Sequence, residues 1–144
     1  MWTFHPSVGF FSAVIDRQKP GNILVRFRDP EHAAAFLALA WKGKRGRKSD
    51  IRETPQADYR WKLSITAERF TATVSDLADE VTYSNFKSEC GRRPLMGSAM
   101  HALQEVWHVM HEHQCAIVER RANAARTARL DAAGEPVDVD LFEL

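Results

Sequence analysis

Two stretches in the N-terminal half of the chain have the composition of β-strands. Residues 8–15 are rich in aromatic and β-branched side chains, and residues 23–28 form a second run of the same kind. The segment between them contains Pro20 and Gly21, two residues that favour turns. Because the connection is short, we expect the two strands to form an antiparallel hairpin.

A clean alternation of apolar and polar residues over 59–65 predicts a third strand that is buried on one face only. We expect its apolar side chains on the buried face: Tyr59, Trp61, Leu63 and Ile65. Arg60 and Lys62 belong to the opposite face, because side chains alternate along a strand. A short run at 51–54, which ends before Pro55, predicts one further strand.

Three segments carry the signals of helices. Asp29, followed by a proline, is expected to cap a helix that extends to about Trp41. Thr66 is expected to cap a second helix that runs to about Val81, and residues 95–130 form mostly one long helix. The order β-β-α-β-β-α, followed by the long helix, predicts an α+β fold: an antiparallel sheet with helices on one face and a long C-terminal helix.

Composition and charge fit one globular domain with an acidic end. Of the 144 residues, 44% are hydrophobic and 27% are charged. The formal net charge is +1, but five of the nineteen acidic residues and no basic residue lie from Asp131 onward. Twenty basic residues against fourteen acidic ones leave +6 on the rest. We therefore expect a single domain over 1–130 and an acidic flexible tail over 131–144.

The sequence also indicates a compartment. No apolar run approaches the roughly 20 residues that span a bilayer, and the first residues lack the basic and apolar regions of a secretory signal. Cys90 and Cys115 lie far apart, which favours free thiols in a reducing environment. These features predict a cytoplasmic protein without a membrane partner.

Several short segments recur together in a known group of proteins. They are Gly9–Ser12, Leu24–Arg26, Glu53–Tyr59, Tyr83–Lys87, and His101 followed by Val106 and Trp107. As a set they resemble a family of short uncharacterised bacterial proteins, over roughly residues 1–114. The family has no known activity, cofactor or catalytic residue, so the resemblance implies a fold and no chemistry.

The first candidate site is a basic surface. If helices cover the apolar side of the sheet, the strand cations face outward together, and the basic loop at 42–48 adds to them. The nine residues are Arg26, Arg28, Lys42, Lys44, Arg45, Arg47, Lys48, Arg60 and Lys62. Such a surface suits a phosphate backbone, because counterion release drives binding. The expected burial of the strand aromatics leaves few rings for base stacking, and an ordinary solvated face is the alternative.

The second candidate lies on the long helix, whose polar side carries metal-ligating residue types. At helical spacing they share one side: His108, His111, Glu112 and Cys115, with His101 beside them. Imidazole and thiolate groups at this spacing suit zinc or a softer metal. The alternatives are a solvated face and a partner interface. The opposite side is expected to be core: Met96, Ala99, Leu103, Val106, Trp107, Met110 and Ile117.

The third candidate is the tail. Asp140, Leu141 and Phe142 resemble the end of the short peptide by which bacterial proteins dock on the replication sliding clamp. Asp138 and Val139 depart from that peptide, which has Gln and Leu at their places. Two adjacent apolar residues on an acidic tail suit a partner's pocket. The alternative is a tail that folds back on its own basic body.

The chain has no Gly-rich phosphate loop, nucleophile elbow or zinc-protease motif. We therefore expect a non-enzymatic binding module without a cofactor. An adaptor or small inhibitor that engages a protein partner of the nucleic-acid-handling machinery, encoded by a chromosome or a phage, fits these features. The alternatives are direct nucleic-acid binding through the nine cations, and a small metal-binding protein or enzyme. The long C-terminal helix also suggests a homo-oligomer.

Overall fold

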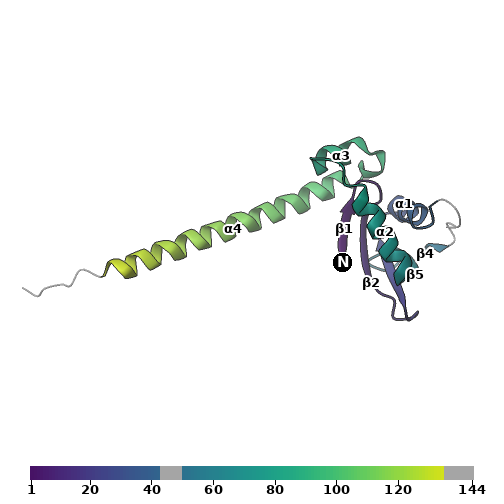
Figure 1. The fold of residues 1–144 in the computed structure, drawn as a ribbon, viewed down its shortest axis with the longest axis horizontal. Coiled ribbons are helices and arrows are strands. Elements are labelled where there is room, and N and C mark those ends of the chain that lie inside the picture. The colour runs from purple at the N-terminus through teal and green to yellow at the C-terminus, as the bar shows by residue number, and fades with distance from the viewer. Residues whose placement is uncertain (43–49, 135–144) are drawn as a thin grey trace, which may run out of the picture. The chain divides into compact units, whose positions relative to one another are not determined.

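The computed structural model describes residues 1–42 and 50–134 of the chain. Its centre is a five-stranded antiparallel sheet with the strand order β1-β2-β3-β5-β4 (Figure 1). The strands are β1 (Trp2–His5), β2 (Gly9–Ile15), β3 (Asn22–Phe27), β4 (Arg52–Glu53) and β5 (Trp61–Thr66). The fold is α+β, as predicted, and the predicted hairpin is formed by β2 and β3.

Helices follow the strands where the sequence supplies caps. They are α1 (Pro30–Ala40), α2 (Ala67–Asp79), α3 (Phe86–Arg92), the 3₁₀ turn η2 (Pro94–Met96) and α4 (Met100–Ala133). The Asp29 carboxylate accepts a hydrogen bond from the backbone N–H of Glu31 at 2.7 Å. The Thr66 hydroxyl accepts one from the N–H of Arg69 at 3.3 Å. Both predicted N-caps are therefore confirmed.

Helices α1 and α2 both pack on one face of the sheet (Figure 1). The core between the sheet and these helices contains Phe11, Val25, Phe27, Phe36 and Leu63, all of them buried. The ring of Phe36 lies 5.0 Å from that of Phe11 and 5.7 Å from that of Phe27, measured between centroids. The inward-facing residues predicted for β3 and for the body of β5 are therefore confirmed.

The start of β2 requires glycine because a helix side chain packs directly against it. Gly9 has a φ of +72°, and a Cβ atom there would lie 2.2 Å from the His32 ring of α1. Nδ1 of His32 accepts a hydrogen bond from the backbone N–H of Phe10 at 3.2 Å. Only glycine combines this backbone conformation with such a close approach.

A second apolar cluster lies in the segment after α2. It comprises Cys90, Met96, Ala99 and Leu103, and Phe4 of β1 packs against it. These residues belong to a compact unit, Met1–Leu103, and the chain from Gln104 onward forms a second unit. Within the described residues, every helix is too short or too polar to cross a membrane.

Two elements were not predicted from the sequence. Strand β1 has four residues, too few for a clear alternation, and it exists through its pairing with β2, from Trp2 opposite Ser12 to His5 opposite Gly9. Helix α3 has seven residues, and its cap is the Asn85 side chain, which accepts from the N–H of Ser88 at 2.9 Å. Both elements are too short for the periodicity of their own residues to reveal them.

Candidate functional site

One line of side chains crosses all five strands on the face of the sheet opposite α1 and α2. Trp2 pairs with Ser12, Ser12 with Arg26, Arg26 with Lys62, and Lys62 with Arg52. We call these five residues the cross-strand row. Because neighbouring strands lie about 4.8 Å apart, the row is about 19 Å long. It has the Trp2 ring at one end, the buried Ser12 next to it, and three cations at the other end.

In the part of the chain that the structure describes, the three cations of the row have no ion-pair partner. Like charges directly opposite each other on neighbouring strands are destabilising. Even so, none of Arg26, Lys62 and Arg52 forms an ion pair with any acidic residue in 1–42 or 50–134. Arg26 donates to the Ser12 hydroxyl at 2.7 Å, and its buried Nε has no hydrogen-bond partner within the described chain. Among the described residues, the row therefore holds three cations that form no ion pair.

The other predicted cations that the structure describes are neutralised. A guanidinium nitrogen of Arg28 lies 2.8 Å from the Asp58 carboxylate. Nε of Arg60 lies 2.6 Å from the Glu53 carboxylate. Lys42 lies 3.5 Å from Asp76. The structure thus separates the predicted basic surface into paired cations and the unpaired row. It adds Arg52 to the row, which sequence reasoning missed.

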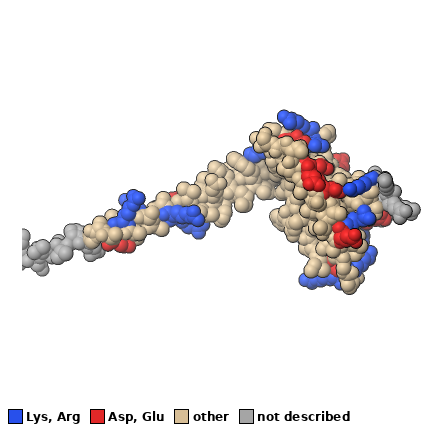
Figure 2. All heavy atoms as spheres, viewed as in Figure 1, with Lys and Arg blue, Asp and Glu red and all other residues tan. Residues whose placement is uncertain are grey.

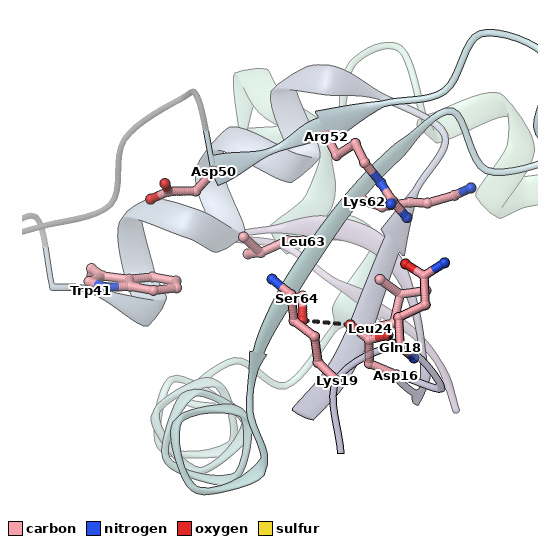
Figure 3. A pocket seen from close by; sticks show the side chains of 10 residues that line it. All are labelled: Asp16, Gln18, Lys19, Leu24, Trp41, Asp50, Arg52, Lys62, Leu63 and Ser64. Atoms are coloured by element: carbon pink, nitrogen blue, oxygen red, sulfur yellow. Dashed lines mark hydrogen bonds between the residues drawn. The ribbon is translucent and has the colours of Figure 1, made fainter. Parts of the chain in front are cut away.

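Two adjoining depressions flank the row. One, of about 480 Å³, lies where β5 continues past the end of the two-residue β4 (Figure 3). The other, of about 740 Å³, lies over β2 and β3. Leu24 and Arg52 line both, with Lys62 in the first and Arg26 in the second. Figure 3 shows Arg52 and Lys62 on the neighbouring strands β4 and β5. The cations therefore border two hollows that share the apolar side chain of Leu24.

One carboxylate, that of Asp16, lines both depressions. The Ser64 hydroxyl donates to it at 2.6 Å, and the backbone N–H of Gln18 donates at 2.9 Å. These hydrogen bonds, that of Ser64 first, lower the pKa of Asp16 below its ordinary value. Asp16 is therefore ionised at neutral pH. It repels phosphate and can accept hydrogen bonds from amino groups.

Two aromatic side chains lie on the open face as well: Trp2, which is outside every predicted strand, and Tyr59, which is buried as predicted but not in the core between the sheet and the helices. The Trp2 side chain is 69% exposed and meets Phe10 edge to face at 5.7 Å. Tyr59 is only 6% exposed, and the guanidinium carbons of Arg26 and Arg28 each lie 4.5 Å from its ring centroid. Its predicted place on the core face is wrong, because β5 begins at Trp61 and the alternation starts there.

Several predicted site residues lie outside the described part of the chain. They are the loop cations Lys44, Arg45, Arg47 and Lys48, and the tail residues Asp140, Leu141 and Phe142. Their proposed roles in binding nucleic acid and a partner protein stay predictions.

The predicted metal ligands of α4 form two separate pairs. Nε2 of His108 lies 3.3 Å from the Glu112 carboxylate, and Sγ of Cys115 lies 3.8 Å from Nε2 of His111. In the described residues no group of three or more such side chains converges on one point. A tetrahedral site needs at least three protein ligands, so the geometry of α4 does not support the metal alternative.

The opposite face of α4 was predicted to be core, and only its beginning is. Leu103 is buried, but Trp107 is 50% exposed, Met110 59% and Val118 60%. The prediction is wrong from Val106 onward, because the second apolar cluster ends at Leu103.

Comparisons of the chain with protein families, with curated proteins and with solved structures found no match.

Proposed function

We propose that this chain is a non-enzymatic binding module that binds single-stranded nucleic acid across the open face of its sheet. The observation that carries the proposal is the cross-strand row, with three adjacent cations that no described carboxylate neutralises. An unfavourable arrangement of like charges that persists at one place in a fold is best explained by a ligand. The ligand must be anionic.

The composition of the row favours a nucleic acid over a small anion. Proteins that bind single strands combine cations that follow the phosphates with aromatic rings on which bases stack. Trp2 supplies an exposed ring at one end of the row, and Arg26, Lys62 and Arg52 supply the cations. The row extends over about 19 Å, so it suits a polymer that bears several phosphates. A free phosphate ion would contact one or two of the cations only.

A single strand fits better than a duplex. The exposed Trp2 ring gains stacking energy only from bases that are not already stacked within a helix. Asp16 lines the depressions beside the row and stays ionised. Its oxygens suit the exocyclic amino groups of bases and disfavour phosphates. The phosphates are therefore expected against the cations of the row, and the amino groups of the bases against Asp16, which lines the same hollows.

Fluorescence anisotropy with labelled single-stranded DNA and RNA tests this proposal. The decisive variants form a matched pair with the same change in charge. Arg52→Gln/Lys62→Gln removes unpaired cations of the row, and Arg28→Gln/Arg60→Gln removes cations that are already paired with Asp58 and Glu53. We expect the first to weaken binding by about tenfold or more and the second to change it little. No binding by the unaltered protein at low salt, or equal losses in both variants, would refute the proposal.

A further inference from the structure

Helix α4 carries an apolar face that continues past Leu103 with exposed side chains. Trp107, Met110, Ile117 and Val118 line a single shallow depression along the helix, together with Gln114 and Arg121. Trp107, Met110 and Val118 are each at least half exposed. The rings of Trp107 and His111 stack on each other at 5.3 Å, which covers only one flank. Soluble monomers seldom expose an apolar stripe of this kind.

We propose that this face pairs with the same face of a second copy of the chain, in an antiparallel arrangement centred on Ile117. A two-fold axis at Ile117 places each residue that precedes Ile117 opposite a residue of the second copy that follows Ile117 by the same number of positions. Met110 then faces Ala124 of the second copy, and Val106 faces Ala128. The pairing therefore uses α4 from Val106 to Ala128, a length of about 33 Å at 1.5 Å per residue.

The sizes of the side chains favour the antiparallel arrangement. The first half of the face carries large residues: Val106, Trp107 and Met110. The second half carries small ones at the same helical spacing: Ala124, Ala125 and Ala128. Antiparallel pairing sets each large half against the small half of the other copy, so that the Trp107 ring fills the space that alanines leave. Parallel pairing would set Trp107 against Trp107 and leave a gap between alanines.

The charges favour the same arrangement. Arg121 lies in the middle of the face, and in Figure 2 the basic residues of α4 gather on its C-terminal half. They are Arg120, Arg121, Arg126 and Arg129. Parallel pairing would bring the two Arg121 side chains together, which is unfavourable. Antiparallel pairing separates the two Arg121 side chains by eight residues, about 12 Å along the helix axis. It places each Arg121 near Gln114 of the second copy, and the amide oxygen of Gln114 can accept a hydrogen bond from the guanidinium group.

The size of the contact sets the expected strength. Each helix contributes a stripe about 33 Å long and about 10 Å wide. Two such stripes amount to about 660 Å², less than the roughly 1,000 Å² of a stable specific interface, so the pairing belongs to the weak, reversible class. We therefore expect a reversible dimer with a dissociation constant on the order of micromolar.

Sedimentation equilibrium of the full chain tests the dimer, with a matched pair of glutamate variants. Met110→Glu places a charge in the centre of the face, whereas Ala116→Glu places the same charge on the exposed opposite side. We expect the unaltered protein and Ala116→Glu to form dimers, and Met110→Glu to raise the dissociation constant about tenfold or more. A monomer at about 100 µM protein, roughly a hundred times the expected dissociation constant, would overturn the proposal, and so would equal effects of the two substitutions.

Disulfide cross-linking tests the orientation, in a chain that carries Cys115→Ser. Met110→Cys mixed with Ala124→Cys is expected to yield a cross-linked dimer, and Met110→Cys alone is not. Cross-linking of Met110→Cys with itself would show a parallel pair and overturn the proposal. The chain's own tail is the competing occupant. If Leu141→Ala/Phe142→Ala, rather than Met110→Glu, abolishes the assembly, the tail covers the face and the proposal fails.

Discussion

The two faces of the sheet are made by the same strands, but they follow different rules. The face toward α1 and α2 carries the buried core, in which Phe11, Val25, Phe27 and Leu63 pack together. The opposite face places three like charges on adjacent strands and leaves the Trp2 ring in solvent. The first arrangement is what stability requires, whereas the second weakens the fold slightly. The comparison indicates that the first face holds the domain together, and it supports our proposal that the second binds a ligand.

The largest expected effect is on the free energy of unfolding. It is expected from an aromatic ring packed in the core, and not from one on the open face. Phe36→Ala removes a fully buried ring that contacts Phe11, Phe27 and Phe70. We expect it to lower the free energy of unfolding by about 3–5 kcal/mol. Trp2→Ala, on the open face, is expected to lower it by less than about 1 kcal/mol. Urea denaturation of both variants measures the difference, and a similar loss in both would show that the open face is also structural.

The same open-face variant is expected to affect binding. Trp2→Ala removes the ring on which a base would stack, so we expect the binding free energy for a single strand to fall by about 1–3 kcal/mol. Trp2→Phe keeps an aromatic surface and is expected to restore most of the affinity. Anisotropy titrations at one salt concentration measure both variants. Full affinity in Trp2→Ala would place the bases elsewhere on the protein.

Smaller effects on stability should have opposite signs for unpaired and paired cations. Arg52→Gln/Lys62→Gln relieves repulsion across β4, β5 and β3, and we expect it to stabilise the fold by about 0.2–1 kcal/mol. Arg28→Gln/Arg60→Gln breaks two exposed ion pairs, and we expect a loss of about the same size. Thermal unfolding at low salt compares the two. Destabilisation by the first double variant would mean that the row contributes to the fold itself.

The smallest effect concerns pH and His5, at the end of β1. Burial lowers the pKa of His5 below its ordinary value, although the Glu80 carboxylate opposes this shift. Between the lowered pKa and about 6.5, the unfolded chain binds more protons than the folded one. Stability is therefore complete above that range and falls as the pH falls through it. Urea denaturation at pH 7.5 and 5.5 should show a smaller pH effect in His5→Asn than in the unaltered protein.

The sequence predicted the faces of single strands better than the surface they form together. Alternation correctly assigned Val25, Phe27 and Leu63 to the core, because the apolar residues within a single strand already show which of its faces is buried. It misplaced Tyr59, since the pattern continues through a residue that precedes the strand. The cross-strand row could not be predicted from the sequence. It depends on strand order and register, and Arg52 and Trp2 belong to strands that are short or were not predicted.

Helix α4 teaches a related lesson. Its periodicity correctly predicted a long helix with an apolar face. Periodicity states that such a face will be covered, but it does not state by what. The first turn is covered by the chain's own second cluster, up to Leu103. For the face beyond Leu103, we infer pairing with a second copy from the sizes and charges of its side chains rather than from its hydrophobicity.

The most direct test of the central claim is the salt dependence of single-strand binding. Each cation that neutralises a phosphate contributes about −0.7 to the slope of log K against log salt concentration. For three cations we predict a slope of about −2, which Arg52→Gln/Lys62→Gln reduces to about −0.7. Arg28→Gln/Arg60→Gln should leave the slope unchanged. Equal slopes in the two double variants would contradict the claim that the unpaired row is the site where the nucleic acid binds.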